Sequence, residues 1–179
     1  MLRLSKSLLN QPVISLRLGR PVAIATEPII NPHNLKIVGW WCKSPGGKTK
    51  PQVLVAEDVR ELTLQGILIN DEGDLIFADE LVRYKDVLAI HFQLLDKVVK
   101  TKRRKLGKIS DFAYEDKGLF IQKLYVARAL HKIFSSEDTL IIDRSQIIEV
   151  TDHYVLVRDS EITVNEEELA ASIEAVPAS

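Results

Sequence analysis

The residues best suited to bind a partner form a run of positive charge between positions 97 and 108. The sequence KVVKTKRRKLGK holds seven basic residues and no acid. Like charges this close repel one another, and a phosphate backbone would reward such a cluster through counterion release. Two interpretations stay open: a solvated turn paired with the acidic tail, or a surface for RNA or lipid. The candidate partner-binding residues are Lys100, Lys102, Arg103, Arg104 and Lys105.

Two adjacent tryptophans are a second candidate for partner binding. Trp40 and Trp41 lie on an expected strand, so their side chains should point to opposite faces and one of them could reach the surface. Their counterparts in a sequence repeat described below, Leu124 and Tyr125, are also large. This favours packing, because aromatic residues mostly fill protein cores. We keep Trp40 and Trp41 as partner-binding candidates beside that interpretation.

The sequence shows no constellation of catalytic, cofactor-binding or metal-binding residues. Gly47-Lys48-Thr49 resembles the end of a phosphate-binding loop, but Cys42 stands where that motif needs its first glycine and a β-rich segment follows instead of a helix. The four histidines have no metal-ligand spacing, and no esterase or metalloprotease motif occurs. We therefore expect a protein that is not an enzyme, without cofactor or metal.

A repeat of nearly ninety residues organises the chain. The matched segments are LLNQPV at 8–13 with LLDKVV at 94–99, Leu18-Gly19 with Leu106-Gly107, Leu35 with Leu119, and 67–69 with 155–157. The two Leu-Gly pairs lie four positions further apart in the sequence than Leu35 and Leu119 do. This difference predicts a turn four residues longer in the first copy. Solenoid repeats are roughly 20 to 50 residues long. Each copy should therefore be a small domain.

The local pattern within each copy is typical of antiparallel sheet. Short runs of Val, Ile, Leu and Tyr alternate with polar clusters that contain Gly, Asn, Asp or Pro. Hairpin tips are expected at 31–34 and 115–118, and Gly39 predicts a β-bulge or a tight barrel corner. We expect a first strand at residues 1–4. Six further strands are expected near residues 12–17, 21–25, 35–42, 52–57, 60–64 and 66–70.

These segments resemble two PRC-barrel domains. The resemblance covers about residues 4–70 and 92–159, in LLNQPVISLRLGRP…NPHNLKIVGWW and LLDKVVKTKRRKLGKISDFAYEDKGLFIQKLYV…LIIDRSQIIEV. The family includes the cytoplasmic domain of the photosynthetic reaction-centre H subunit and the C-terminal domain of the ribosome maturation factor RimM. The resemblance implies a small, mainly antiparallel β-barrel for each copy, and it transfers no catalytic residue.

The expected fold class is mainly β, with two small antiparallel PRC-type barrels joined by a short helix. We assign residues 1–78 to the first barrel, 79–91 to a linker helix with Asp79 in its cap, 92–160 to the second barrel and 161–179 to an acidic C-terminal helix. The helical interpretation of 79–91 depends on apolar residues at helical spacing, and that of the tail on the capping-box spacing of Asn165 and Glu168. A further short helix is expected at 127–134.

The location and function follow from what is present and absent. The first residues lack the apolar run of a secretory signal, no apolar stretch approaches about 18 residues, and the single Cys42 indicates a reducing compartment. We expect a cytoplasmic, non-catalytic binding or adaptor protein, in RNA or ribonucleoprotein (ribosome) assembly through protein partners. One alternative is a structural module that docks on a membrane-associated complex through the basic hairpin. An enzyme is the third alternative.

Overall fold

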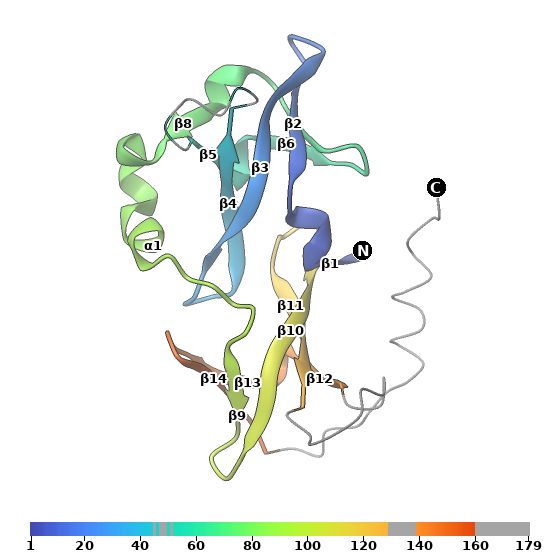
Figure 1. Ribbon diagram of the computed structural model, residues 1–179, viewed down its shortest axis with the longest axis vertical. Helices are drawn as coiled ribbons and strands as arrows, with labels where there is room; N and C mark the ends of the chain where they lie inside the picture. Colours follow the sequence, from blue (N-terminus) through green and yellow to red (C-terminus); the bar gives the residue numbers. More distant parts are fainter. Residues whose placement is uncertain (45, 47–49, 51, 129–138, 160–179) are drawn as a thin grey trace. The chain divides into compact units, whose positions relative to one another are not determined.

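The computed structural model describes residues 1–44, 46, 50, 52–128 and 139–159. The fold is mainly β, with one short α-helix among these residues (Figure 1). The chain divides into two compact units. The first unit contains Met1–Leu94 and Ala113–Gln122, and the second contains Leu95–Phe112 and Lys123–Ser179.

The strands of the first copy form one curled, half-barrel sheet. Its order is β6-β7-β2-β3-β4-β5-β8, in which β2 and β7 are parallel and all other neighbours are antiparallel. The bounds are β2 Gln11–Ser15, β3 Arg20–Asn31, β4 Lys36–Lys43, β5 Gln52–Val55, β6 Val59–Leu62, β7 Ile67–Ile69 and β8 Leu75–Phe77. The long β3 and the edge strand β8 were not anticipated from the sequence.

The strands of the second copy follow the same plan. Their order is β13-β14-β9-β10-β11-β12, and β9 and β14 are again parallel. The bounds are β9 Val98–Lys100, β10 Lys105–Glu115, β11 Ile121–Ala127, β12 Thr139–Asp143, β13 Ile147–Val150 and β14 Tyr154–Val157. The N-terminal strand β1, Leu2–Leu4, pairs with the end of β10.

The two copies match in detail, not only in strand order. In the parallel pairs, Val13 lies opposite Ile67 and Val99 lies opposite Val155. Positive φ angles recur at matching positions: Asn10 and Asp96 have 54° and 63°, and Leu35 and Leu119 have 50° and 58°. Such angles are uncommon outside glycine, so their recurrence supports a duplicated backbone. The predicted internal repeat is confirmed as a repeat of topology.

The predicted equivalence of the two Leu-Gly pairs is wrong. Val13 lies opposite Ala23 and Val99 lies opposite Gly107, so the structural counterpart of Gly107 is Ala23. Gly19 instead occupies the β2–β3 tip with φ 64°. The extra residues of the first copy therefore lie in this hairpin. The β3–β4 and β10–β11 turns are equal in length, with N–H groups of Leu35 and Leu119 donating to the carbonyls of Asn31 and Glu115.

The predicted bulge at Gly39 is confirmed. The β3–β4 register shifts where Gly39 faces Ile29, before Ile37 faces Ile30. A Cβ atom on Gly39 would lie 2.4 Å from the Leu54 carbonyl oxygen, so no other residue fits. This close approach lets β5 pair tightly with β4.

The expected linker helix is present in part. Helix α1 spans Lys85–Ile90 and follows two 3₁₀ turns, Ala78–Glu80 and Val82–Tyr84. Asp79 is not a cap, because the turn around it begins at Phe77 without a side-chain hydrogen bond. Leu88 of α1 packs against Ile29, Val38, Val53 and Val55 of the first sheet, beside which Figure 1 shows the helix. The expected helices at 127–134 and 161–179 lie outside the described residues, wholly or almost so.

The tip of the β10–β11 hairpin belongs to the first unit. The N–H of Ile37 donates to the Leu119 carbonyl at 2.8 Å, and the N–H of Ile121 donates to the Leu35 carbonyl at 2.9 Å. Tyr114 is buried, and its hydroxyl lies 3.0 Å from the Ser7 hydroxyl. This segment of the second copy is therefore part of the first unit.

Candidate functional site

The basic residues lie on a tight hairpin between β9 and β10 in the second unit. Lys100 pairs with Lys105, and the Thr101 N–H donates to the Arg104 carbonyl at 2.8 Å, which leaves Lys102 and Arg103 at the tip. The turn is short because β10 must return at once to pair with β9. Five cationic side chains are therefore held within one turn of chain.

Thr101 fixes the shape of this turn from below. Its side chain is buried, and its hydroxyl accepts hydrogen bonds from the N–H groups of Arg103 and Arg104, both at 3.2 Å. Threonine hydroxyls commonly stabilise turns in this way. Because the hydroxyl is used inside the turn, it positions the cations and does not face a ligand.

An aromatic side chain lies beside the cations. Lys100 is directly opposite Leu156 of the parallel strand β14, and its ammonium nitrogen lies 3.5 Å from the centre of the Tyr154 ring. The hairpin and β14 enclose an open pocket of about 340 Å³. The pocket is lined by Lys100, Thr101, Lys102, Arg103, Arg104, Lys105, Tyr154 and Leu156.

The positive charge of this pocket is only partly balanced. Arg103 is 86% exposed and its Nε lies 3.4 Å from the Asp159 carboxylate. Within the described part of the chain, Lys102, Arg104 and Lys105 are exposed and form no ion pair. Lys100 and Lys105 face each other across two strands, an arrangement that costs stability when the charges are alike. An anionic ligand would remove that cost.

The remaining members of the basic run lie outside the pocket lining. The Lys97 ammonium donates to the Asp152 carbonyl at 2.5 Å, and Lys108 lies further along β10 opposite Val98. Lys97 therefore serves a structural contact next to the β13–β14 turn. The part of the basic run that lines the pocket is therefore Lys100–Lys105.

The two tryptophans have different environments in the first unit. Trp40 is fully buried and its indole N–H has no hydrogen-bond partner among the described residues, so its ring offers no surface to a partner. Trp41 is half-buried and stacks on His91, with ring centres 6.2 Å apart. Trp41 also packs on the apolar cluster under α1. Neither tryptophan lines the pocket of the basic hairpin.

Sequence reasoning did not identify Tyr154 and Leu156 as part of the site. The signal was available in YVLV at 154–157, since alternation places Tyr154 and Leu156 on the face opposite the buried Val155 and Val157. Their neighbourhood to the basic run depends on the parallel pairing of β14 with β9. That pairing joins segments more than fifty residues apart, and it becomes visible only in the folded chain.

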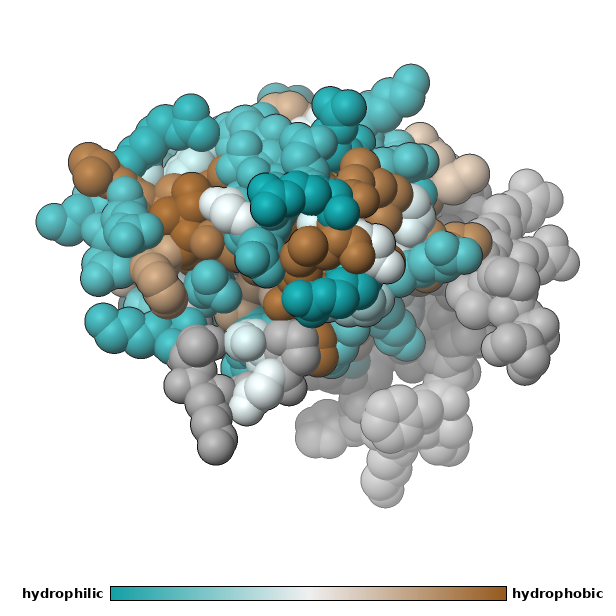
Figure 2. All heavy atoms as spheres, turned by 90° about the horizontal axis from the view of Figure 1, so that it is seen from above, coloured by the Kyte–Doolittle hydropathy of each residue, from teal (hydrophilic) through white to brown (hydrophobic). Residues whose placement is uncertain are grey.

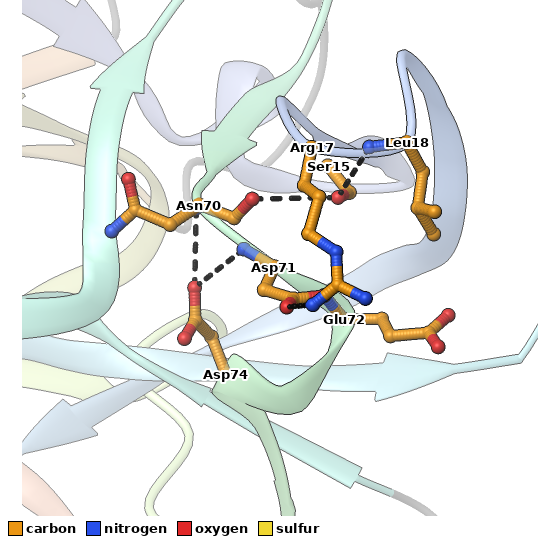
Figure 3. A network of polar contacts seen from close by, with 7 residues as sticks. All are labelled: Ser15, Arg17, Leu18, Asn70, Asp71, Glu72 and Asp74. Atoms are coloured by element: carbon orange, nitrogen blue, oxygen red, sulfur yellow. Dashed lines mark hydrogen bonds and ion pairs between the residues drawn. The ribbon is translucent and has the colours of Figure 1, made fainter.

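The equivalent hairpin of the first copy is closed by a polar network (Figure 3). The Arg17 guanidinium pairs with Asp71, and the Ser15 hydroxyl accepts from the Leu18 N–H at 3.2 Å. The Asp74 carboxylate accepts from the N–H groups of Asn70 and Asp71, both at 3.1 Å. Here Arg17 is paired with an aspartate, and this tip lacks the run of neighbouring cations that lines the pocket of the second copy.

Apolar side chains take the place of cations at this first-copy tip. Leu16 and Leu18 are 54% and 38% exposed. Figure 2 shows apolar residues gathered in small patches between hydrophilic side chains on the face that it displays. Small patches of this kind are ordinary on protein surfaces, and they give no reason to assign a ligand.

Metal-binding clusters and the single cysteine are further kinds of candidate site to consider among the described residues. No group of three or more His, Cys, Asp or Glu side chains within them is placed to hold a metal ion. Burial raises the pKa of the Cys42 thiol to about 12, outweighing the opposing hydrogen bond with the Leu54 backbone. At neutral pH this thiol is therefore protonated and a poor nucleophile.

No protein-family model matches the chain, and no curated protein matches it. Helix α1 has six residues, and nowhere in the described chain is there a helix with the length and apolarity needed to cross a bilayer.

Proposed function

We propose that this protein is a non-catalytic adaptor built from two PRC-type barrels, and that its basic hairpin binds RNA within a ribonucleoprotein assembly. The observation that carries the proposal is the pocket at Lys100–Lys105, where Lys100 lies over the Tyr154 ring and four exposed cations line the same pocket. Phosphate contacts supply most non-specific affinity for nucleic acid, and aromatic rings supply stacking. Protein partners would bind other surfaces of the adaptor.

The two copies support a division of labour in this proposal. The same strand order carries a closed, internally paired tip in the first copy and an open, cationic tip in the second. A duplicated scaffold can keep one copy for stability while the other acquires a ligand. The resemblance to PRC-barrel domains, one of which belongs to a ribosome maturation factor, makes ribosome assembly the leading setting.

Salt-dependent RNA binding tests the proposal. The affinity for a labelled single-stranded RNA, measured by gel retardation, should fall about 50-fold between 50 and 200 mM salt if four phosphates are contacted. Replacing Arg103, Arg104 and Lys105 by Ser should abolish the shift. The matched control replaces Lys6, Lys85 and Lys117, three exposed lysines outside the site, by Ser and changes net charge equally. Equal binding by both triple variants would reject the hairpin as the RNA contact.

Vesicle binding distinguishes the alternative function. A module docking on a membrane-associated complex through the same cations would co-sediment with anionic vesicles and not with neutral ones. The proposal predicts RNA retardation at physiological salt without such co-sedimentation. Co-sedimentation without RNA retardation would replace the proposed function by the membrane alternative.

A further inference from the structure

The contact between Lys100 and Tyr154 indicates more than a preference for negative charge. A pocket that needed only cations would gain nothing from an aromatic ring at its wall. Yet the Tyr154 ring lies beneath the Lys100 ammonium at 3.5 Å and lines the same pocket as Lys102 and Arg104. The ring is half-buried, since Tyr154 alternates with the buried Val155 on β14. The ring is therefore partly accessible, and it lines the pocket together with the cations.

We infer that this pocket binds single-stranded RNA, with one base stacked on Tyr154 and the flanking phosphates on the surrounding cations. The inference rests on the proposed RNA binding and names the form of RNA that the pocket selects. A base in a duplex has both faces covered by its neighbours, so it cannot lie on the tyrosine without being unstacked. An unpaired base has a free face for stacking.

The Lys100 ammonium does not prevent stacking. Lys100 and Tyr154 are both partly exposed, so their cation–π contact corresponds to about two- to thirtyfold in affinity, whereas stacking of a base on an aromatic side chain corresponds to about five- to 150-fold. A base can therefore displace the ammonium from the ring. The displaced Lys100 side chain is flexible and remains opposite Lys105, where a phosphate would relieve the repulsion between the two.

The first copy shows what the scaffold looks like without this function. The counterpart of Lys100 is Ile14, because each lies opposite a leucine in the parallel pair, Leu156 or Leu68. The counterpart of Tyr154 is Gly66, since both carbonyls accept from the N–H of an equivalent threonine at 2.9 Å. The cation and the aromatic ring thus occur together in one copy and are absent together from the other.

The experiment compares three probes of equal length on the full chain: single-stranded RNA, the same sequence as a duplex, and a ribose-phosphate strand without bases. Fluorescence anisotropy should show single-stranded RNA bound at least tenfold more tightly than the abasic strand at the same salt. The duplex should also bind less tightly than the single strand, although its two strands give it the higher phosphate density. This comparison needs no variant and so does not depend on the folding of one.

Variants at one position then locate the effect. Tyr154→Leu should weaken single-strand binding about tenfold and leave the abasic strand and the slope of affinity against salt unchanged. Tyr154→Phe keeps the ring and should bind within about twofold of the parent. Equal affinity of the parent for all three probes, or an unchanged single-strand affinity in Tyr154→Leu, overturns the inference while RNA binding by the cations stands. Failure of the parent to bind any of the probes overturns both.

Discussion

The β2–β3 and β9–β10 hairpins rest on the same scaffold and present opposite chemistry. Each lies next to a parallel strand pair, and each turn is held by a hydroxyl, from Ser15 or Thr101. Each also pairs an arginine at its tip with an aspartate, Arg17 with Asp71 and Arg103 with Asp159. The scaffold therefore fixes the turn and one ion pair. What differs is the set of residues around them.

The two hairpin tips differ in how many of their charged side chains lack an ion-pair partner among the described residues. In the first copy, Asp71 also caps the 3₁₀ turn Glu72–Asp74 and is bound to Asp74 through its N–H, so the arginine closes a finished network. Among the described residues of the second copy, Arg103 pairs with Asp159, and Lys102, Arg104 and Lys105 form no ion pair. A duplicated fold thus separates the residues that maintain the turn from those that are free to meet a ligand.

The largest expected effect comes from Gly66, the counterpart of Tyr154. Gly66 has φ 144°, and a Cβ atom there would lie 2.3 Å from the Pro12 carbonyl oxygen. Gly66→Ala should destabilise the protein by at least about 3 kcal/mol, from backbone strain and the clash. Gly73→Ala is the control, because nothing lies within 4 Å of its Cβ position. Urea unfolding measures both, and equal midpoints would mean that the first copy could carry an aromatic residue here.

The next effect distinguishes the turn hydroxyls. Thr101→Val keeps the shape but removes the acceptor for the N–H groups of Arg103 and Arg104. We expect a loss of about 1 to 2 kcal/mol and looser positioning of the cations. Thr101→Ser, which imitates Ser15, should restore most of that loss. Thermal unfolding gives the stability, and a valine variant as stable as the parent would show that the turn does not need this hydroxyl.

Much of this arrangement could be predicted from local sequence. The hairpin tips at 31–34 and 115–118 were found because Pro, Asn and Gly determine turn conformation at their own positions. The bulge at Gly39 was found because a glycine within a strand signals a close backbone approach. The candidate cations were found because they lie within six consecutive positions, 100–105. In each case the determining residues are neighbours in the chain.

The wrong equivalence of the two Leu-Gly pairs and the omission of Tyr154 have the same cause. Both depend on contacts between residues far apart in the sequence. Gly19 and Gly107 looked equivalent, but Gly19 supplies a positive φ, whereas Gly107 is needed because Ala127 approaches to 2.0 Å of its Cβ position. One residue type thus answers two physical demands that sequence spacing cannot separate. Tyr154 joins the cations only through the β9–β14 pairing. That pairing joins strands that lie more than fifty residues apart in the sequence.

A smaller effect is expected at Asp143, the second-copy counterpart of Val55. Asp143 caps the 3₁₀ turn Arg144–Gln146, whereas Val55 begins the matching turn Ala56–Asp58 without a side-chain cap. Hydrogen bonds from the Ser145 backbone and side chain lower the pKa of Asp143 despite the opposing effect of burial, and Lys123 adds to the lowering. Asp143→Ala should cost about 1 kcal/mol at neutral pH.

The pH dependence of that cost tests its origin. Because the folded pKa is below the unfolded value of about 3.9, the charge-dependent part of the stabilisation is complete above that value and is lost as pH falls through the folded pKa. The difference in free energy of unfolding between the parent and Asp143→Ala should therefore become smaller as the pH falls. Asp143→Asn keeps a capping oxygen without the charge, so its stability relative to Ala should vary little with pH. Chemical unfolding from pH 7 to pH 3 measures this, and a pH-independent difference for both variants would exclude the carboxylate charge.

The smallest effect concerns Cys42, whose structural counterpart is Val126. Both side chains are buried, and both lie on the strand that follows the equivalent turn. This buried position therefore accommodates either cysteine or valine. Cys42→Val should change stability by less than about 1 kcal/mol. In the parent, a pKa of about 12 should make the thiol react with a thiolate-specific reagent at pH 7 about a thousandfold more slowly than in urea. Rapid modification of the folded protein, or strong destabilisation by valine, would show that this slot differs between the two copies.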